Sequence, residues 1–77
     1  MKESIRRFIS DQLLSGTAIA DDDDLLLSGL LDSMSVMRLV AHLEKAFGVK
    51  IPPQDVVIEN FTSVDTITAY LEGKEAA

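Results

Sequence analysis

Cysteine is absent from this 77-residue chain, so disulfide bonds and thiolate metal sites cannot hold it together, which suits a reducing compartment. Basic residues are also few. Seven Lys and Arg stand against thirteen Asp and Glu, and the formal net charge of -6 argues against nucleic acid and anionic membrane as partners. A chain of this length has room for one small core and no deep catalytic cleft, so we expect a single domain over residues 1–77.

Long apolar runs are missing as well. None approaches the roughly 18 residues of a membrane span, and Glu3, Arg6 and Arg7 interrupt the N-terminal segment where a signal peptide would be apolar. We therefore expect a cytoplasmic protein with no membrane insertion. The four consecutive aspartates at residues 21–24 lack the alternating ligand spacing of a calcium loop. Acid runs are usually solvated, and we expect no metal site here.

Three segments carry helical patterns. Apolar spacing predicts a first helix over residues 2–15, stopped by Gly16, and a second helix over residues 32–48. Residues 62–65 have the [ST]-x-x-[DE] form of a capping box, and the spacing after them predicts a last helix up to Gly73. We expect an ordered core over about residues 2–73 and a frayed tail after it.

The connections between these helices differ in character. Residues 17–32 lose the periodicity, and the apolar stretch within them must lie over the core as a loop. A loop of about 16 residues is long for a compact domain and usually has a function. Ile51-Pro52-Pro53 blocks a continuous helix, so residues 54–60 can form only a short turn. The expected fold is all-α, with three main helices and one short one.

The predicted second helix carries two apolar faces. At about 100° per residue, one arc forms the core stripe: Val36, Leu39, Val40, Leu43 and Phe47. Met34, Met37 and Ala41 lie on the far side, beside Arg38. One buried stripe is enough for a bundle helix, and flexible methionine side chains suit a docking surface. The alternative is that Met34 and Met37 lie under a neighbouring loop as part of the core.

Ser33 admits three interpretations. Together with Asp32 it could simply cap the second helix. A nucleophilic serine needs a base, but the only histidine, His42, lies about 13 Å of helical rise away, so we expect a surface role for it and no enzyme. The third interpretation is covalent modification by a phosphate-bearing group, which the amides at a helix N-terminus favour, with Asp32 orienting the modifying enzyme. Ser35 lies within the first turn and is the poorer candidate.

At this point the residues resemble a known family. Asp32-Ser33-Met34, the exit Phe47-Gly48-Val49-Lys50-Ile51-Pro52 and the closing helix after Phe61 are similar to the acyl and peptidyl carrier proteins over nearly the whole chain. The resemblance implies a monomeric four-helix bundle whose Ser33 carries 4'-phosphopantetheine from coenzyme A, with the cargo held as a thioester.

The resemblance also implies partners. They are a phosphopantetheinyl transferase, an adenylating acyl or aminoacyl ligase, and a downstream acyltransferase, synthase or thioesterase. Met34, Met37 and Ala41 match the family's partner-facing positions. The residues expected to dock partners are Leu31, Met34, Met37, Arg38 and Ala41.

The motif departs from the carriers of fatty acid synthesis. Those carriers usually have glycine three residues before the serine and an acidic second helix, whereas here Gly29 is four residues before Ser33 and Arg38 replaces an acid. The G-L-L-D-S-M form resembles D-alanyl and other stand-alone carrier proteins. We therefore expect a discrete carrier for an amino acid or a specialised polyketide or nonribosomal acyl group. The alternatives are a general fatty acid carrier and a helical interaction module without a prosthetic group.

Overall fold

The computed structural model describes residues 1–76, and all regular structure within them is helical. The expected all-α fold, with three main helices and one short one, is confirmed. The elements in chain order are α1 (Lys2–Phe8) continued by the π-helical segment η1 (Ile9–Leu13), α2 (Ser33–Phe47), the 3-10 turn η2 (Pro53–Asp55), α3 (Ile58–Phe61) and α4 (Val64–Ala76). None of the helices in this part of the chain is long and apolar enough to cross a membrane.

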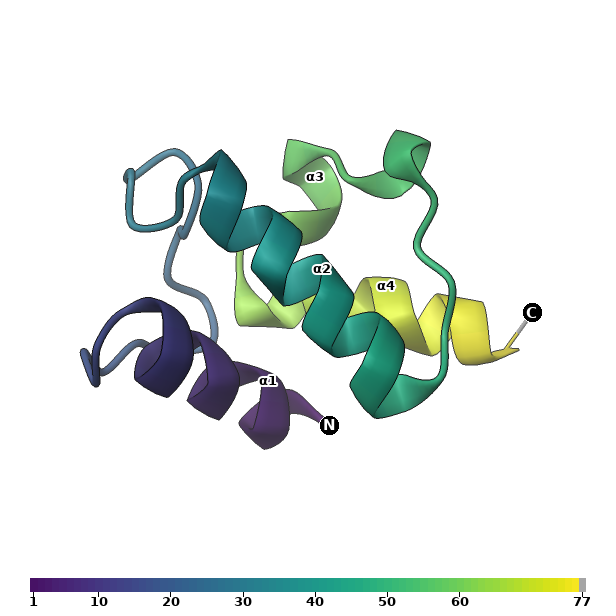
Figure 1. The fold of residues 1–77 in the computed structure, drawn as a ribbon, viewed down its shortest axis with the longest axis horizontal. Helices are drawn as coiled ribbons and strands as arrows, with labels where there is room; N and C mark the ends of the chain where they lie inside the picture. Colours follow the sequence, from purple (N-terminus) through teal and green to yellow (C-terminus); the bar gives the residue numbers. More distant parts are fainter. Residues whose placement is uncertain (77) are drawn as a thin grey trace.

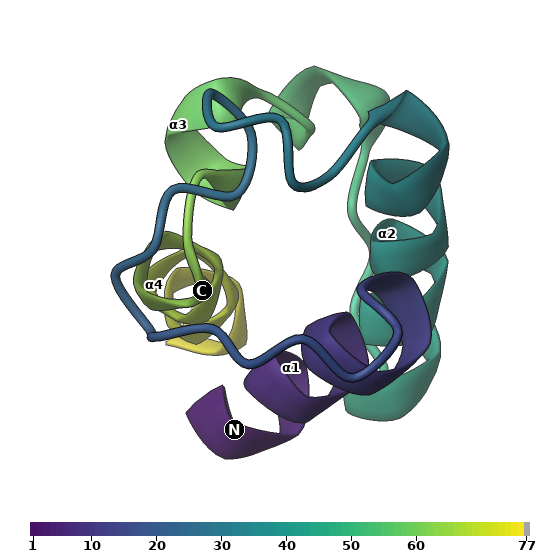
Figure 2. The ribbon, with the colours of Figure 1, turned by 90° about the vertical axis from the view of Figure 1, so that its left-hand side faces the viewer.

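The helices surround one apolar core. Figure 1 shows the long helix α2 running in front of α4, with α1 and α3 on either side of it. In the view turned by 90°, the four helices form a ring (Figure 2). Apolar side chains fill the space that they enclose. Every one of these helices and the long loop contribute to the buried set: Ile5, Ile9, Leu25, Leu31, Leu39, Val40, Leu43, Ile51, Phe61, Val64, Ile67 and Leu71. The core stripe predicted for α2 is therefore buried at its centre, while Val36 and Phe47 are partly buried at its ends.

The first helix widens before it ends. The Leu14 N–H donates to the carbonyl of Ile9 at 3.0 Å, five residues back, and the Gly16 N–H donates to the carbonyl of Ser10 at 2.7 Å. Ser15 and Gly16 both adopt positive φ, 53° and 89°, and this left-handed pair turns the chain away from the helix axis. The predicted stop at Gly16 is confirmed, and the regular helix ends slightly before it.

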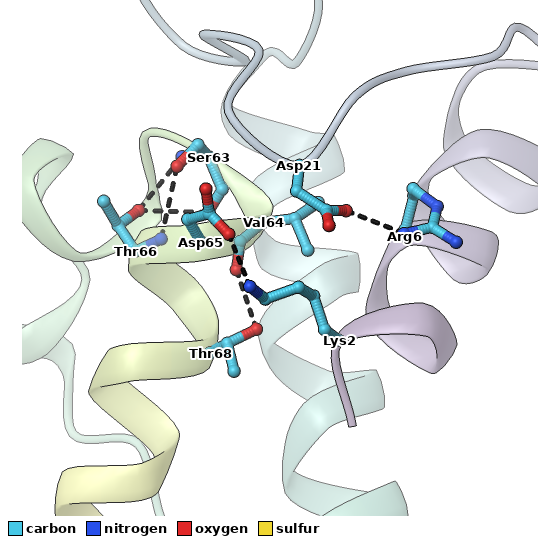
Figure 3. A network of polar contacts seen from close by, with 8 residues as sticks. All are labelled: Lys2, Arg6, Asp21, Ser63, Val64, Asp65, Thr66 and Thr68. Atoms are coloured by element: carbon cyan, nitrogen blue, oxygen red, sulfur yellow. Dashed lines mark hydrogen bonds and ion pairs between the residues drawn. The ribbon is translucent and has the colours of Figure 1, made fainter.

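The long loop is held to α1 and α4 through Asp21 and is folded on itself by Asp24, so it is not merely solvated. The Arg6 guanidinium lies 2.8 Å from Oδ1 of Asp21, and the Asp65 N–H donates to the Asp21 carbonyl at 3.0 Å (Figure 3). Oδ1 of Asp24 accepts the N–H groups of Leu26 and Leu27 at 3.0 and 2.8 Å. The acid run therefore organises the loop, and the expectation that water alone surrounds it is wrong for these two aspartates.

The capping box of α4 lies one residue later than predicted. Oγ of Ser63 accepts the Thr66 N–H at 3.2 Å, and Oγ1 of Thr66 accepts the Ser63 N–H at 3.0 Å (Figure 3). Thr62 cannot be the cap because its backbone is still helical at the end of α3, with φ -66° and ψ -37°, whereas an N-cap residue is extended. Asp65, the predicted partner in the box, instead pairs with Lys2 at 2.8 Å.

The last helix also extends further than predicted. α4 passes through Gly73 and reaches Ala76, beyond the predicted end of the last helix. Lys74 helps to explain the extension, since its ammonium lies 3.7 Å from a carboxylate oxygen of Asp55 on the opposite segment. The final residue, Ala77, lies outside the described residues.

Candidate functional site

Ser33 is the first residue of α2 and is exposed to solvent. Asp32 is the N-cap, with extended backbone at φ -94° and ψ -178°, and its Oδ1 accepts the Ser35 N–H at 2.8 Å. Gly29 supplies the left-handed turn, at φ 82°, that brings the loop to this point. Because Asp32 does the capping, the Ser33 hydroxyl is left without a hydrogen bond to the described part of the chain.

The Asp32 carboxylate is held in its charged form. The hydrogen bond from the Ser35 N–H, which stabilises the carboxylate, lowers the pKa of Asp32 below its ordinary value of 3.8. At neutral pH a negative charge therefore lies immediately before Ser33 at the positive end of the helix dipole. This charge is available to orient a cation or a basic group that approaches the serine.

The first turn of α2 still has a free donor. Val36 donates its N–H to the Asp32 carbonyl at 3.0 Å, and the Ser35 N–H is used by the Asp32 side chain. The N–H groups of Ser33 and Met34 have no backbone carbonyl acceptor within the helix, because the first amides of a helix lack a preceding turn, and the Met34 N–H faces the Asp32 carboxylate. A 15-residue helix whose Ser33 N–H has no partner in the described part of the chain favours an anionic group attached there.

An apolar cavity of about 490 Å³ opens beside Ser33. One wall comes from the loop and α2, and the opposite wall comes from α3 and the short segment between η2 and α3. The lining is apolar except at Asp32 and Ser33, and consists of Leu26, Leu31, Asp32, Ser33, Val36, Met37, Val56, Val57, Ile58 and Phe61. A group linked to the Ser33 oxygen would therefore have an apolar surface within reach.

The far wall of this cavity is tied to α4. The Tyr70 hydroxyl donates to Oδ2 of Asp55 at 2.5 Å, and the Lys74 ammonium lies 5.7 Å from the centre of the Tyr70 ring. The Asn60 side chain donates to the Asp55 carbonyl at 2.9 Å. Burial and the adjacent carboxylate raise the pKa of Tyr70, so it is a neutral donor. Asp55 immediately precedes Val56, and the contact thus positions the wall.

Four of the five predicted docking residues are exposed. Met34 and Met37 expose 77% and 61% of their surface, and Arg38 and Ala41 are exposed as well. These exposures exclude the alternative in which the two methionines lie under a loop. Leu31 exposes only 4% and belongs to the core, so its predicted role in docking is wrong. The Leu31 N–H donates to the Leu25 carbonyl at 2.8 Å, and this hydrogen bond folds the loop so that the Leu31 side chain enters the core.

Sequence reasoning missed other apolar residues on this side of the molecule. Leu27 and Leu30 protrude from the loop, and Val57 and Ile58 are exposed at the edge of the cavity wall. The only sequence signal was that too many leucines lie in one loop for all of them to be buried. Which ones protrude depends on the loop's contacts, such as the 2.7 Å hydrogen bond from the Leu25 N–H to the Thr62 carbonyl.

His42 is not the plain surface residue expected. Its ring stacks on Phe8 with 3.8 Å between ring centroids and 7° between planes, and Nε2 is buried without a hydrogen-bond partner in the described part of the chain. The contact joins α1 to α2. His42 lies more than two helical turns from Ser33 along α2, so it cannot act as a base for the Ser33 hydroxyl.

Comparisons with known proteins agree on one family. A family model described as "Phosphopantetheine attachment site" matches residues 3–71. The D-alanyl carrier protein of Lactococcus lactis subsp. cremoris (strain MG1363) is 35% identical over 96% of this chain and 95% of its own. The D-alanyl carrier protein of Streptococcus suis (strain 98HAH33) is 30% identical over 87% and 85%, and an acyl carrier protein of Kineococcus radiotolerans is 34% identical over 80% and 67%.

A solved structure has a similar fold. It is described as "Crystal structure of FAD-dependent dehydrogenase", and one of its chains superimposes with a TM-score of 0.80 at 38% identity. The match covers 87% of this chain and 97% of that one. The predicted helical bundle is thereby confirmed.

Proposed function

The chain belongs to the family of proteins with a phosphopantetheine attachment site, and we propose that within this family it is a stand-alone carrier of an amino acid or a specialised acyl group. It is a carrier protein that holds an acyl group on a 4'-phosphopantetheine arm. When bound, the arm supplies a thiol on which the cargo is held as a thioester. The chain has no cysteine of its own to do this.

Ser33 is our proposed attachment residue. The observation that carries this is its exposed hydroxyl at the start of α2, left uncommitted because Asp32 caps the helix. The free amide of Ser33 suits a phosphodiester, and the apolar cavity beside it suits the body of the arm. The residues present therefore fit the group. Asp32 has the proposed role of orienting the enzyme that attaches it.

The proposed cargo class rests on the relatives. Three D-alanyl carrier proteins of Lactococcus lactis are 35% identical over nearly the full length of both chains. We infer that an adenylating ligase loads the carrier and that an acyltransferase, synthase or thioesterase unloads it. In this role the chain presents cargo and catalyses nothing. We further infer one carrier domain over residues 1–77, working as a cytoplasmic monomer.

The proposed docking surface consists of Met34, Met37, Arg38 and Ala41. All four are exposed on α2, and they follow Ser33 along the same helix. A partner bound there would hold its own active site close to the attachment point. This surface is discontinuous with the core stripe, so a partner can bind it without unfolding the bundle.

A flavin-dependent dehydrogenase is a second candidate among the downstream partners. The structure described as that enzyme contains a chain 38% identical to this one, and the match covers 97% of that chain, which is thus of carrier size. In this case the cargo on the carrier would lose a hydride to FAD and a proton to a base. The candidate changes the fate of the cargo and leaves the role of Ser33 unchanged.

The test is intact-protein mass spectrometry. We expect the apo chain to gain about 340 Da when it is incubated with coenzyme A and a broad-specificity phosphopantetheinyl transferase. Ser33→Ala should abolish the gain, and the matched control Ser35→Ala should retain it. No gain on the wild-type chain would overturn the proposal. A gain that survives Ser33→Ala would move the attachment to another residue. The mass of the chain from its own cells then identifies the cargo.

A further inference from the structure

Positive charge is concentrated on one side of this acidic protein. Three of the seven basic side chains are neutralised, since Lys2, Arg6 and Lys74 lie 2.8, 2.8 and 3.7 Å from carboxylate oxygens. Of the others, Arg38 and Lys45 lie on α2, and Lys50 lies in the loop that follows it. All three are exposed and make no ion pair with the described residues. The protein therefore has a locally basic face although its net charge is -6.

These cations flank the proposed docking surface. Residues three, four and seven positions apart share one side of a helix, which puts Met34, Arg38, Ala41 and Lys45 in one line along α2. At the far end of this line Ala41, Lys45 and Lys50 help to line a shallow hollow of about 480 Å³, to which Glu44 also contributes. Along this face apolar side chains therefore alternate with guanidinium or ammonium groups.

Negative charge does not cancel these groups. α2 has a single acidic residue, Glu44, and its Oε2 accepts the Ile51 N–H at 2.9 Å. That contact is partly buried and directs the carboxylate toward the backbone of the following loop. Asp32 lies at the other end of α2 and is occupied by the Ser35 N–H. The central part of the face is left with uncompensated positive charge.

We propose that this face of α2 binds partner enzymes whose docking site is an apolar groove flanked by carboxylates. The inference rests on the proposed function, since it specifies the partner of the same carrier. Complementary charges at the edge of an interface speed encounter and fix the orientation of the partners. They also exclude enzymes with basic docking sites, which Arg38 and Lys45 would repel.

Two other occupants fit the charges less well. A second copy of the chain bound through the same face would bring Arg38 and Lys45 against their own counterparts, because a two-fold interface pairs a surface with itself. Nucleic acid would meet the basic face but also the repulsion of a chain with net charge -6. An acidic protein groove avoids both conflicts.

The first test measures loading kinetics on the holo chain. The probe is the adenylating ligase of the same organism that charges the wild-type carrier. We expect Arg38→Gln/Lys45→Gln/Lys50→Gln to raise KM about tenfold at low salt with little change in kcat, and the difference to shrink as salt screens the charges. Arg7→Gln removes an exposed cation on α1 and should change KM less than about twofold. An unchanged or lower KM in the triple variant would overturn the proposal.

A second test needs no natural partner. Two synthetic amphipathic helical peptides share one leucine face and carry either glutamate or lysine beside it. Titrated into the ¹⁵N-labelled holo chain, the glutamate peptide should shift the amides of residues 34–50, and the lysine peptide should not. Equal shifts, or stronger ones with lysine, would contradict the inference. Failure of the carrier role itself would be seen separately, as no mass gain with the transferase.

Discussion

Leu30 and Leu31 are neighbours in the chain, but the side chain of Leu30 is exposed and that of Leu31 is buried in the core. Leu31 exposes 4% of its surface and Leu30 exposes 42%. The hydrogen bond from the Leu31 N–H to the Leu25 carbonyl folds the loop back on itself, so that Leu25 and Leu31 both enter the core. The residue just before the cap of α2 is therefore an anchor, and it fixes where Ser33 begins the helix.

This pair gives a matched test of stability. We expect Leu31→Ala to lower the free energy of unfolding by about 2 to 3 kcal/mol, because it removes buried methyl groups and leaves a cavity. Leu30→Ala deletes the same atoms from the surface and should cost less than about 1 kcal/mol. Urea denaturation followed by circular dichroism measures both values. Similar costs for the two variants would mean that the loop packs differently.

The cap of α2 should show a dependence on pH. The lowered pKa of Asp32 means that its stabilising contribution is present above its ordinary pKa of 3.8 and is lost as the pH falls through the folded-state pKa. Asparagine caps helices comparably and does not titrate. We therefore expect the Asp32→Asn variant to have a slightly lower Tm than the wild-type chain at pH 7. This difference in Tm should disappear at acidic pH. A difference in Tm that grows as the pH falls would contradict this role of Asp32.

The Tyr70 contact should contribute measurable stability. Tyr70→Phe keeps the ring against Phe61 and Lys74 but removes the donor to Asp55, and we expect it to cost about 1 kcal/mol in chemical denaturation. Because the pKa of Tyr70 is raised by folding, this contribution is complete below the ordinary pKa of 10.0 and is lost as the pH rises through the higher folded-state pKa. An alkaline absorbance titration should therefore show phenolate at higher pH in the folded chain than in urea. Coincident curves would show that Asp55 and burial do not perturb the hydroxyl.

Met37 allows docking to be separated from folding. Because its side chain is 61% exposed, Met37→Glu should leave Tm nearly unchanged while it weakens transfer of cargo to or from partner enzymes, as a charge placed in an apolar contact must be desolvated. Met37→Leu keeps the apolar character and is the control, expected to retain most of the transfer rate. Loss of folding in the glutamate variant would instead assign Met37 to the core.

The limits of α2 were predictable because local chemistry decides them. Asp32 caps the first turn through its own side chain, and Gly48 ends the helix in the left-handed region at φ 64°. Both signals lie within a few residues of the boundary they set. The attachment residue proposed from the sequence, Ser33, depends on the same boundary, which explains why its exposed position could be anticipated.

Contacts between distant segments set what the sequence could not show. Thr62 and Ser63 are equally suitable as caps, and only the abutting end of α3 makes Ser63 the one that is used. The burial of Leu31 follows from how the loop meets the core, which no local periodicity encodes. His42 lies on a polar stretch of its own helix, yet Phe8 of α1 covers its ring. In each case the packing of a neighbouring element decides the outcome, and the local pattern of the residue itself does not encode it.

The position of Tyr70 has a practical consequence for watching this protein work. The chain has one tyrosine and no tryptophan, so its tyrosine fluorescence comes from Tyr70 alone. A carboxylate that accepts the phenolic hydrogen bond quenches tyrosine emission, and Asp55 is such an acceptor immediately before the cavity wall. Movement of that wall away from α4 would brighten the protein. The intensity of Tyr70 fluorescence should therefore report movement of the cavity wall beside Ser33, in solution and without an added label.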